Sequence, residues 1–296
     1  MPLVDTAKLR IHYAEGGPRD GQTVLLLHGW PDDASAWSGV VPHLEAAGLR
    51  WIAPDLRGFG KTQFRDGATI RDGSGVAIAQ DAFDLMDALG IGAFHIVGHD
   101  WGGRATYHMA AMAPARLLSA TVLAIGYSPR GRFTVPAYPQ CARWWYQWFM
   151  TAEAGAQAVR NDPIGFARRQ WDTWGPTAWI TEDAFAVAAQ AFSNPDWVAV
   201  TLHGYQSRWE LRPMDPDYDA ARAMVDATET LEVPMLFLQG GSDECDPPEE
   251  SEGLESCFSG GYRRQVLPGV GHFPAREAPM EVAHLVCQHI RGHAHG

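Results

Sequence analysis

The stretch HIVGHDWGG (residues 95–103) joins an apolar run to a helical pattern through a turn of the form Gly-x-Asp-x-Gly. The run 95–97 is typical of a buried strand, and apolar residues at three- and four-residue steps over 102–112 predict a helix. Small residues at Gly98 and Gly102 allow the strand and the helix to pass closely around a strained turn. The pattern predicts an elbow that presents the carboxylate of Asp100 beside a helix N-terminus. An ordinary helix N-cap is the alternative role for this Asp.

Further β-branched and leucine-rich runs alternate with helical patterns on both sides of this elbow. Helical periodicity over 78–89 ends at Gly90, a residue type common just after a helix. The alternation predicts the α/β class, with a mostly parallel sheet and helices on both of its faces. The other predicted strands are residues 9–13, 23–27, 50–53, 120–125, 235–239 and 264–267.

The sequence pattern changes between residues 128 and 228. No strand-like run occurs there, and eight of the twelve tryptophans are concentrated in this segment. Turn sequences at 161–163, 175–176 and 194–196 separate helical stretches. We therefore expect a helical cap at 128–228, inserted between a first core part at 1–127 and a second at 229–296.

Composition restricts the partners of the protein. The formal charge of −12 and the pI near 5.4 disfavour nucleic acid and anionic membrane surfaces. No apolar run approaches the roughly 18 residues of a membrane span, and no signal peptide is recognisable, which predicts a cytoplasmic protein. The four cysteines lack CxxC spacing and are expected to be reduced, and we expect no metal site and no cofactor. A homodimer is left open.

Three further segments supply partners for Asp100. A predicted strand runs into HGWP (residues 28–31), and the backbone N–H groups of Trp30 and Trp101 are the candidate oxyanion donors. His272 lies in a glycine-containing turn after the last predicted strand, where its ring can reach the carboxyl edge of the sheet. Asp243 follows the strand 235–239 and is the favoured acid to orient His272, with Asp246 as the other candidate.

Together, HGWP, DLRGFGKT (residues 55–62), GHDWGG and GVGHF (269–273) resemble the α/β-hydrolase superfamily, specifically its epoxide-hydrolase branch. The resemblance covers essentially the whole chain. It implies the α/β-hydrolase fold with an eight-stranded sheet, a helical cap, and a proline after HGx that is often cis. It also implies two cap tyrosines that hold the epoxide oxygen, for which Tyr146 and Tyr205 match best. Other tyrosines in or near the cap are Tyr127, Tyr138 and Tyr218.

The resemblance implies hydrolysis of a small apolar epoxide to a vicinal diol through a hydroxyalkyl ester on Asp100. His272, oriented by Asp243, would then activate water, and the substrate would lie against Trp30, Trp101, Tyr146 and Tyr205. A haloalkane dehalogenase is the closest alternative, although such relatives usually carry Asn where this chain has Trp30. Fluoroacetate dehalogenases usually have Arg where it has Trp101. A non-catalytic receptor on the same fold is a further alternative.

Overall fold

The structure, a computed structural model, describes residues 2–176, 179 and 181–293. In this part of the chain nine strands form one sheet, and eight of them follow the continuous order β1-β2-β4-β3-β6-β7-β8-β9. The strands from β4 to β9 along this order are parallel, whereas β1, β2 and β5 pair in antiparallel fashion. The prediction of a mostly parallel sheet is confirmed, but the resemblance implied eight strands, and the ninth is the two-residue strand β5, which pairs with β2 beside the continuous order. The strands are β1 (Leu3–Asp5), β2 (Leu9–Gly16), β3 (Thr23–Leu27), β4 (Arg50–Pro54), β5 (Gln63–Phe64), β6 (Phe94–His99), β7 (Leu117–Leu123), β8 (Met235–Gly240) and β9 (Tyr262–Leu267).

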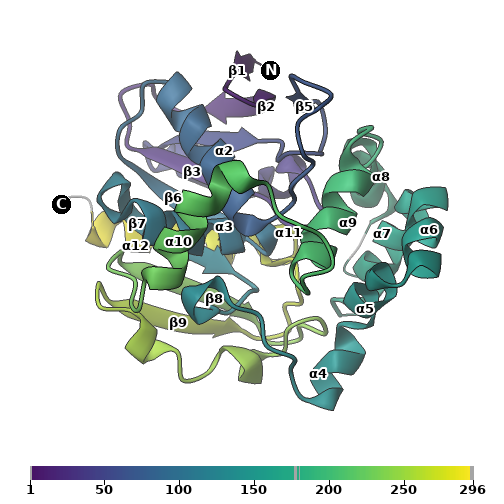
Figure 1. Cartoon of the computed structure of the whole chain (residues 1–296). Helices are drawn as coiled ribbons and strands as arrows, with labels where there is room; N and C mark the ends of the chain where they lie inside the picture. The colour runs from purple at the N-terminus through teal and green to yellow at the C-terminus, as the bar shows by residue number, and fades with distance from the viewer. Residues whose placement is uncertain (1, 177–178, 180, 294–296) are drawn as a thin grey trace.

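Helices cover both faces of the sheet (Figure 1). Alternate residues of the buried strand β3 divide between two apolar clusters, since neighbouring side chains of a strand point to opposite faces. Leu25 and Leu27 pack with α2 and α3, whereas Val24 and Leu26 pack with α1 and α12. Two apolar layers therefore hold the sheet, and the carboxyl ends of its parallel strands meet at one edge. The helices are α1 (Val41–Ala46), α2 (Gly75–Ala88), α3 (Trp101–Met112), α4 (Tyr138–Arg143), α5 (Trp145–Thr151), α6 (Glu153–Asn161), α7 (Pro163–Thr173), α8 (Glu182–Ala191), α9 (Trp197–Ser207), α10 (Asp219–Ala227), α11 (Pro274–Glu277) and α12 (Pro279–Gly292).

Helices α4 to α9 follow β7 in the chain and gather at one side of the sheet (Figure 1). Helix α10 differs from them, because it lies across the front of the core beside α3. Its residues Ala221 and Val225, with Tyr218, form a small apolar cluster with Val76 and Ala77 of α2. No helix in the described residues is long and apolar enough to cross a membrane.

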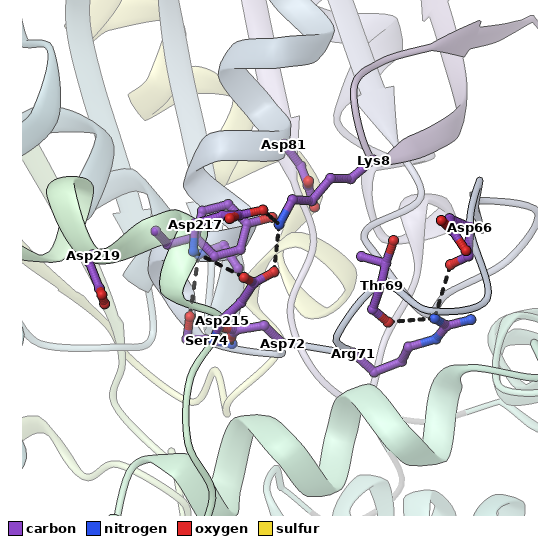
Figure 2. Close-up of polar contacts among 12 residues, drawn as sticks. Lys8, Asp66, Thr69, Arg71, Asp72, Ser74, Asp81, Asp215, Asp217 and Asp219 are labelled. Atoms are coloured by element: carbon purple, nitrogen blue, oxygen red, sulfur yellow. Dashed lines mark hydrogen bonds and ion pairs between the residues drawn. The ribbon is translucent and has the colours of Figure 1, made fainter.

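A polar network ties the segment before α10 to the core, and Figure 2 shows part of it. Lys8 forms ion pairs with Asp215 and with Asp217, the latter at 2.8 Å. One carboxylate oxygen of Asp72 accepts a hydrogen bond from the backbone N–H of Asp215 at 2.8 Å. These contacts hold residues 215–217 against Lys8 and Asp72, which lie more than 140 residues earlier in the chain.

Arg57 is the buried centre of the same region and is 1% exposed. Its guanidinium donates to both carboxylate oxygens of Asp81 at 2.6 and 2.7 Å, to the carbonyl of Asp72 at 2.6 Å and to the hydroxyl of Tyr218 at 2.8 Å. Burial raises the pKa of Asp81 although the Arg57 charge opposes this shift. Removing either charge would leave the other without its partner in the interior.

We predict that Arg57→Met lowers the free energy of unfolding by about 3–5 kcal/mol, because it strands the buried Asp81 carboxylate. Replacing both partners, as in Arg57→Met with Asp81→Leu, should cost less than the single change, since no unpaired charge remains. Arg10→Met, which removes an exposed ion pair with Asp5 at 2.7 Å, is the control and should leave the free energy of unfolding almost unchanged. Urea denaturation measures all three. A double variant less stable than Arg57→Met would contradict this account.

Candidate active site

The turn between β6 and α3 places Asp100 in a strained backbone conformation, with φ 49° and ψ −112°. A side chain at Gly98 would begin only 2.3 Å from the carbonyl oxygen of Gly102, and one at Gly102 would begin 2.3 Å from the carbonyl of Leu27. Only glycine fits at these two positions. A non-glycine residue held at positive φ is costly, and such strain is concentrated at functional sites.

The Asp100 side chain does not cap α3. One carboxylate oxygen instead accepts a hydrogen bond from the backbone N–H of Trp30 at 2.9 Å, and the other lies 3.7 Å from Nε2 of His272. Asp100 is 5% exposed. Burial raises its pKa, but the nearby charge of His272, together with His99 and the Trp30 N–H, outweighs this effect and holds the pKa below its ordinary value. The carboxylate is therefore ionised at neutral pH.

His272 follows β9, and its imidazole is fully buried between two carboxylates. Its Nδ1 lies 2.8 Å from a carboxylate oxygen of Asp243, whose other oxygen accepts from the backbone N–H groups of Cys245 and Asp246 at 2.8 and 2.9 Å. Burial lowers the pKa of His272, but the charges of Asp243 and Asp100 outweigh it and raise the pKa well above its ordinary value. The structure thus brings together three of the residues singled out in the sequence.

Asp246, the other acid candidate, is turned toward a different set of groups. One of its carboxylate oxygens accepts from the indole N–H of Trp144 at 3.2 Å and from the side-chain amide of Gln140 at 3.4 Å. Burial and the neighbouring charge of Asp243 raise the pKa of Asp246 to about 6. The carboxylate hydrogen-bonded to His272 Nδ1 therefore belongs to Asp243.

Cys245, Asp246 and His272 each offer one ligand atom, and these atoms lie within 4.8 Å of one another. Such a set can hold a cation. The thiol of Cys245, however, keeps its proton because burial raises its pKa well above the ordinary value, and the His272 ring is already bonded to Asp243. The geometry therefore fits a catalytic triad of Asp100, His272 and Asp243 better than a metal centre.

Two buried tyrosines reach the site from separate helices, Tyr146 from α5 and Tyr205 from α9. Their rings are nearly perpendicular with centroids 5.5 Å apart, and both pack on Trp30, at 5.7 and 5.1 Å. The Tyr205 hydroxyl accepts from the indole N–H of Trp101 at 3.0 Å. Burial raises both tyrosine pKa values well above their ordinary value, so both hydroxyls keep their protons at neutral pH.

The remaining cap-region tyrosines lie elsewhere. Tyr127 packs with Tyr107 and Phe258, Tyr218 binds Arg57, and Tyr138 is 91% exposed. Among these five tyrosines, only Tyr146 and Tyr205 contact Trp30. This contact separates the two matched tyrosines from the alternatives.

A narrow, largely apolar hollow of about 20 Å³ borders Trp30, Trp101 and Tyr205 on the side of Leu56 and Ile78. Asp100 and Tyr146 do not line it. The indole N–H of Trp30 donates to the hydroxyl of Thr201 at 3.1 Å, which orients the ring. The Trp30–Pro31 peptide bond is cis, as the resemblance implied.

Sequence reasoning missed Trp174, which closes the other side of the site. Its ring lies 4.8 Å from that of His272 and 4.9 Å from that of Tyr146, and its carbonyl accepts from the His272 backbone N–H at 3.0 Å. The concentration of tryptophans between 128 and 228 marked this region. Nothing in the local sequence distinguishes Trp174 from its neighbours, because its role depends on a contact almost 100 residues away.

Comparison with known proteins identifies the family. Residues 22–279 match the family model described as the alpha/beta hydrolase fold. The chain belongs to the α/β-hydrolase family. Its relatives include epoxide hydrolase 3 of Siraitia grosvenorii, 34% identical over 95% of each chain. They also include a fluoroacetate dehalogenase of Burkholderia sp, 35% identical over 96% of this chain and 91% of the relative.

A solved structure from Klebsiella pneumoniae, whose assignment as an epoxide hydrolase is provisional, superposes with a TM-score of 0.91. It is 34% identical, and the match covers 98% of this chain and 97% of the other. The resemblance to the epoxide-hydrolase branch of the superfamily is confirmed. Dehalogenases are among the same relatives, so membership of the family does not by itself distinguish epoxide hydrolysis from dehalogenation.

In this α/β-hydrolase, Asp246 provides a test of the electrostatics around His272. The Asp246 carboxylate is charged above pH 6, where it favours the protonated imidazole. Asp246→Asn removes this charge, so we predict that the pKa of His272 falls. NMR titration of ¹³C-labelled histidine measures it, with Glu250→Gln, an exposed residue of the same cavity, as the control. An unchanged or higher His272 pKa in the Asp246 variant would contradict the account.

Proposed function

We propose that the protein hydrolyses an epoxide to a vicinal diol through a covalent hydroxyalkyl ester on Asp100. The observation that carries the proposal is the convergence of three groups around Trp30. Its backbone N–H binds the ionised carboxylate of Asp100, while its ring packs on the two protonated tyrosines. A carboxylate nucleophile opposite a pair of proton donors suits the opening of a strained ether ring.

Asp100 acts first in the proposed sequence. The oxygen that faces His272 attacks an epoxide carbon, and the ring C–O bond breaks as the new C–O bond to Asp100 forms. The ring oxygen gains negative charge and takes a proton from the hydroxyl of Tyr146 or Tyr205. Because both donors are in place beforehand, they stabilise this charge without rearrangement.

Hydrolysis of the ester is the second step. Formation of the ester removes the negative charge of Asp100, one of the groups that raise the pKa of His272, and the imidazole can then return a proton to the tyrosine pair. Neutral His272, still oriented by Asp243, deprotonates a water that attacks the carboxyl carbon of Asp100. The backbone N–H groups of Trp30 and Trp101 stabilise the resulting oxyanion.

Release of the diol completes the cycle. The oxyanion collapses as the acyl C–O bond breaks, and the departing diol oxygen takes the proton of the newly formed carboxyl group. Asp100 is then ionised and His272 protonated, as at the start.

We also propose the division of the chain into a core of residues 1–127 and 229–296 and a cap of residues 128–228. Tyr146 and Tyr205 both come from this cap, whereas Asp100, Asp243 and His272 come from the core. Closure of the cap over the core would then exclude bulk water from the ester. Helix α10 lies in the same segment but packs on the core helices, so the part of the cap over the site is α4 to α9.

Dehalogenation is the second candidate, supported by the fluoroacetate and haloalkane dehalogenases among the relatives. A departing halide needs N–H donors. Both indole N–H groups beside Asp100 already donate to hydroxyls, Trp101 to Tyr205 and Trp30 to Thr201. This arrangement favours the epoxide reaction. Product analysis with styrene oxide and a 1-haloalkane side by side tests it, and halide release without diol formation would reverse the assignment.

The tyrosine pair gives the sharpest test of ring opening. We predict that Tyr146→Phe and Tyr205→Phe each lower kcat for styrene oxide by about 10²-fold or more, and that the double variant is nearly inactive, because the alkoxide loses its proton donors. Tyr127→Phe removes a buried tyrosine hydroxyl away from the site and is the matched control. Stopped-flow and steady-state diol formation measure the rates. Wild-type turnover by the double variant would show that the tyrosine assignment is wrong.

A further inference from the structure

Arg104 is a buried cation for which the described part of the chain supplies no counter-ion. It lies one turn after Asp100 on α3, and its backbone N–H donates to the Asp100 carbonyl at 2.8 Å. The residue is 8% exposed, and its Nε is buried with no hydrogen-bond partner. Among the residues that the structure describes, its guanidinium takes part in no ion pair or hydrogen bond. Its contacts are with the rings of Phe133 and Trp101, at 4.5 and 5.8 Å.

Arg208, just beyond the end of α9, is a half-buried second cation that has no carboxylate partner among the described residues. Its Nη1 donates to the side-chain oxygen of Gln147 at 3.0 Å, whereas its Nε is buried without a partner. The guanidinium lies 3.9 Å from the ring centroid of Phe133, 4.7 Å from that of Trp101 and 5.1 Å from that of Tyr205. Burial and the charge of Arg104 lower the pKa of Arg208 to about 9, so it is still charged at neutral pH.

The two guanidinium groups therefore share Phe133 and Trp101 as neighbours, and two cavities meet there. Arg104 lines a cavity of about 450 Å³, and Arg208 lines one of about 530 Å³. Phe133 and Arg132 line both. A ligand in either cavity can therefore reach one of these guanidinium groups. Both groups lie against Trp101, the residue that follows Asp100.

Among the described residues, two neighbouring arginines, unlike Arg104 and Arg208, have carboxylate partners. Arg132 pairs with Asp226 at 2.6 Å, and Arg130 pairs with Glu229 at 2.8 Å. These exposed cations have carboxylate partners, whereas the two more enclosed ones have none in the described part of the chain. Burying a charge is unfavourable unless another charge compensates it.

Neither Asp100 nor Asp246 forms an ion pair with Arg104 or Arg208. Asp100 is bound by the Trp30 N–H and faces His272. Asp246 lines the same cavity as Arg104, but its carboxylate accepts from Trp144 and Gln140. The two guanidinium groups keep donors for a further anion, and a planar carboxylate matches the guanidinium fork.

We propose that Arg104 and Arg208 form a carboxylate-binding subsite, so that the preferred substrates are small epoxides that carry a carboxylate near the ring. The inference rests on the proposed epoxide hydrolysis and changes the substrate class expected from the sequence, an apolar epoxide. The Arg208 guanidinium lies 5.1 Å from the centroid of the Tyr205 ring, so the proposed subsite borders one member of the tyrosine pair.

The test compares two substrates of equal size, glycidate (2,3-epoxypropanoate) and the neutral glycidamide. Wild-type protein should show a kcat/KM for glycidate about tenfold or more above that for glycidamide, and Arg104→Met and Arg208→Met should each remove most of this preference, mainly through KM. Glycidamide should respond by less than about threefold in the same variants. Arg160→Met, which removes an exposed arginine paired with Glu153, is the control for loss of one positive charge. Arg104→Lys and Arg208→Lys, which keep the charge, should retain part of the preference and serve where a Met variant does not fold.

Equal kcat/KM for the two substrates, or equal losses for both in the arginine variants, would overturn the subsite and leave epoxide hydrolysis standing. If the wild-type protein converts neither epoxide, nor styrene oxide, the proposed function fails instead. Calorimetry of glycidate with Asp100→Ala then tests the subsite alone. Binding weakened about tenfold by adding Arg104→Met would support the subsite, and absence of binding would overturn it.

Discussion

The backbone turn at Asp100 is the constraint on which the rest of the site depends. With φ 49°, the residue leaves the sheet at the end of β6 and enters α3 at once, and the glycines on either side let two elements pass within contact distance. Asp100 occupies the N-cap position of α3, but its carboxylate makes no capping hydrogen bond and accepts from the Trp30 N–H instead. The strain is balanced by the packed sheet and helix around it, which a flexible loop would not provide.

The charges of Asp100, His272 and Asp243 stabilise one another beside that turn. His272 lies between Asp100 and Asp243, so each carboxylate raises the affinity of the imidazole for a proton, and the protonated imidazole in turn keeps Asp100 ionised. Neutralising Asp100 by ester formation would therefore weaken the hold of His272 on its proton. In this account one electrostatic coupling prepares the nucleophile in the free protein and the base in the intermediate. The order of the two proposed half-reactions follows from it.

Sequence patterns predicted the elements that carry strong local signals. The uninterrupted apolar run of β3 and the Gly-x-Asp-x-Gly turn both appear where expected, and the order of Asp100, Asp243 and His272 along the chain matches their meeting at one sheet edge. The short strands β1 and β5, only three and two residues long, carried no such signal. Arg104 and Arg208 could not be recognised as unpaired, because the absence of a partner depends on which side chains surround them in space. Helix α10 resembles the cap helices in sequence, and only its apolar contacts with α2 show where it packs.

Intact-protein mass spectrometry of His272→Gln tests the central claim, a covalent ester on Asp100, most directly. Ring opening needs the ionised carboxylate and the tyrosine donors, whereas ester hydrolysis needs the imidazole base. Incubation with excess styrene oxide should therefore add the mass of one substrate to the protein, on the peptide that contains Asp100. The double variant Asp100→Ala with His272→Gln should gain nothing. Repeated turnover by His272→Gln with no adduct on that peptide would contradict covalent catalysis by Asp100.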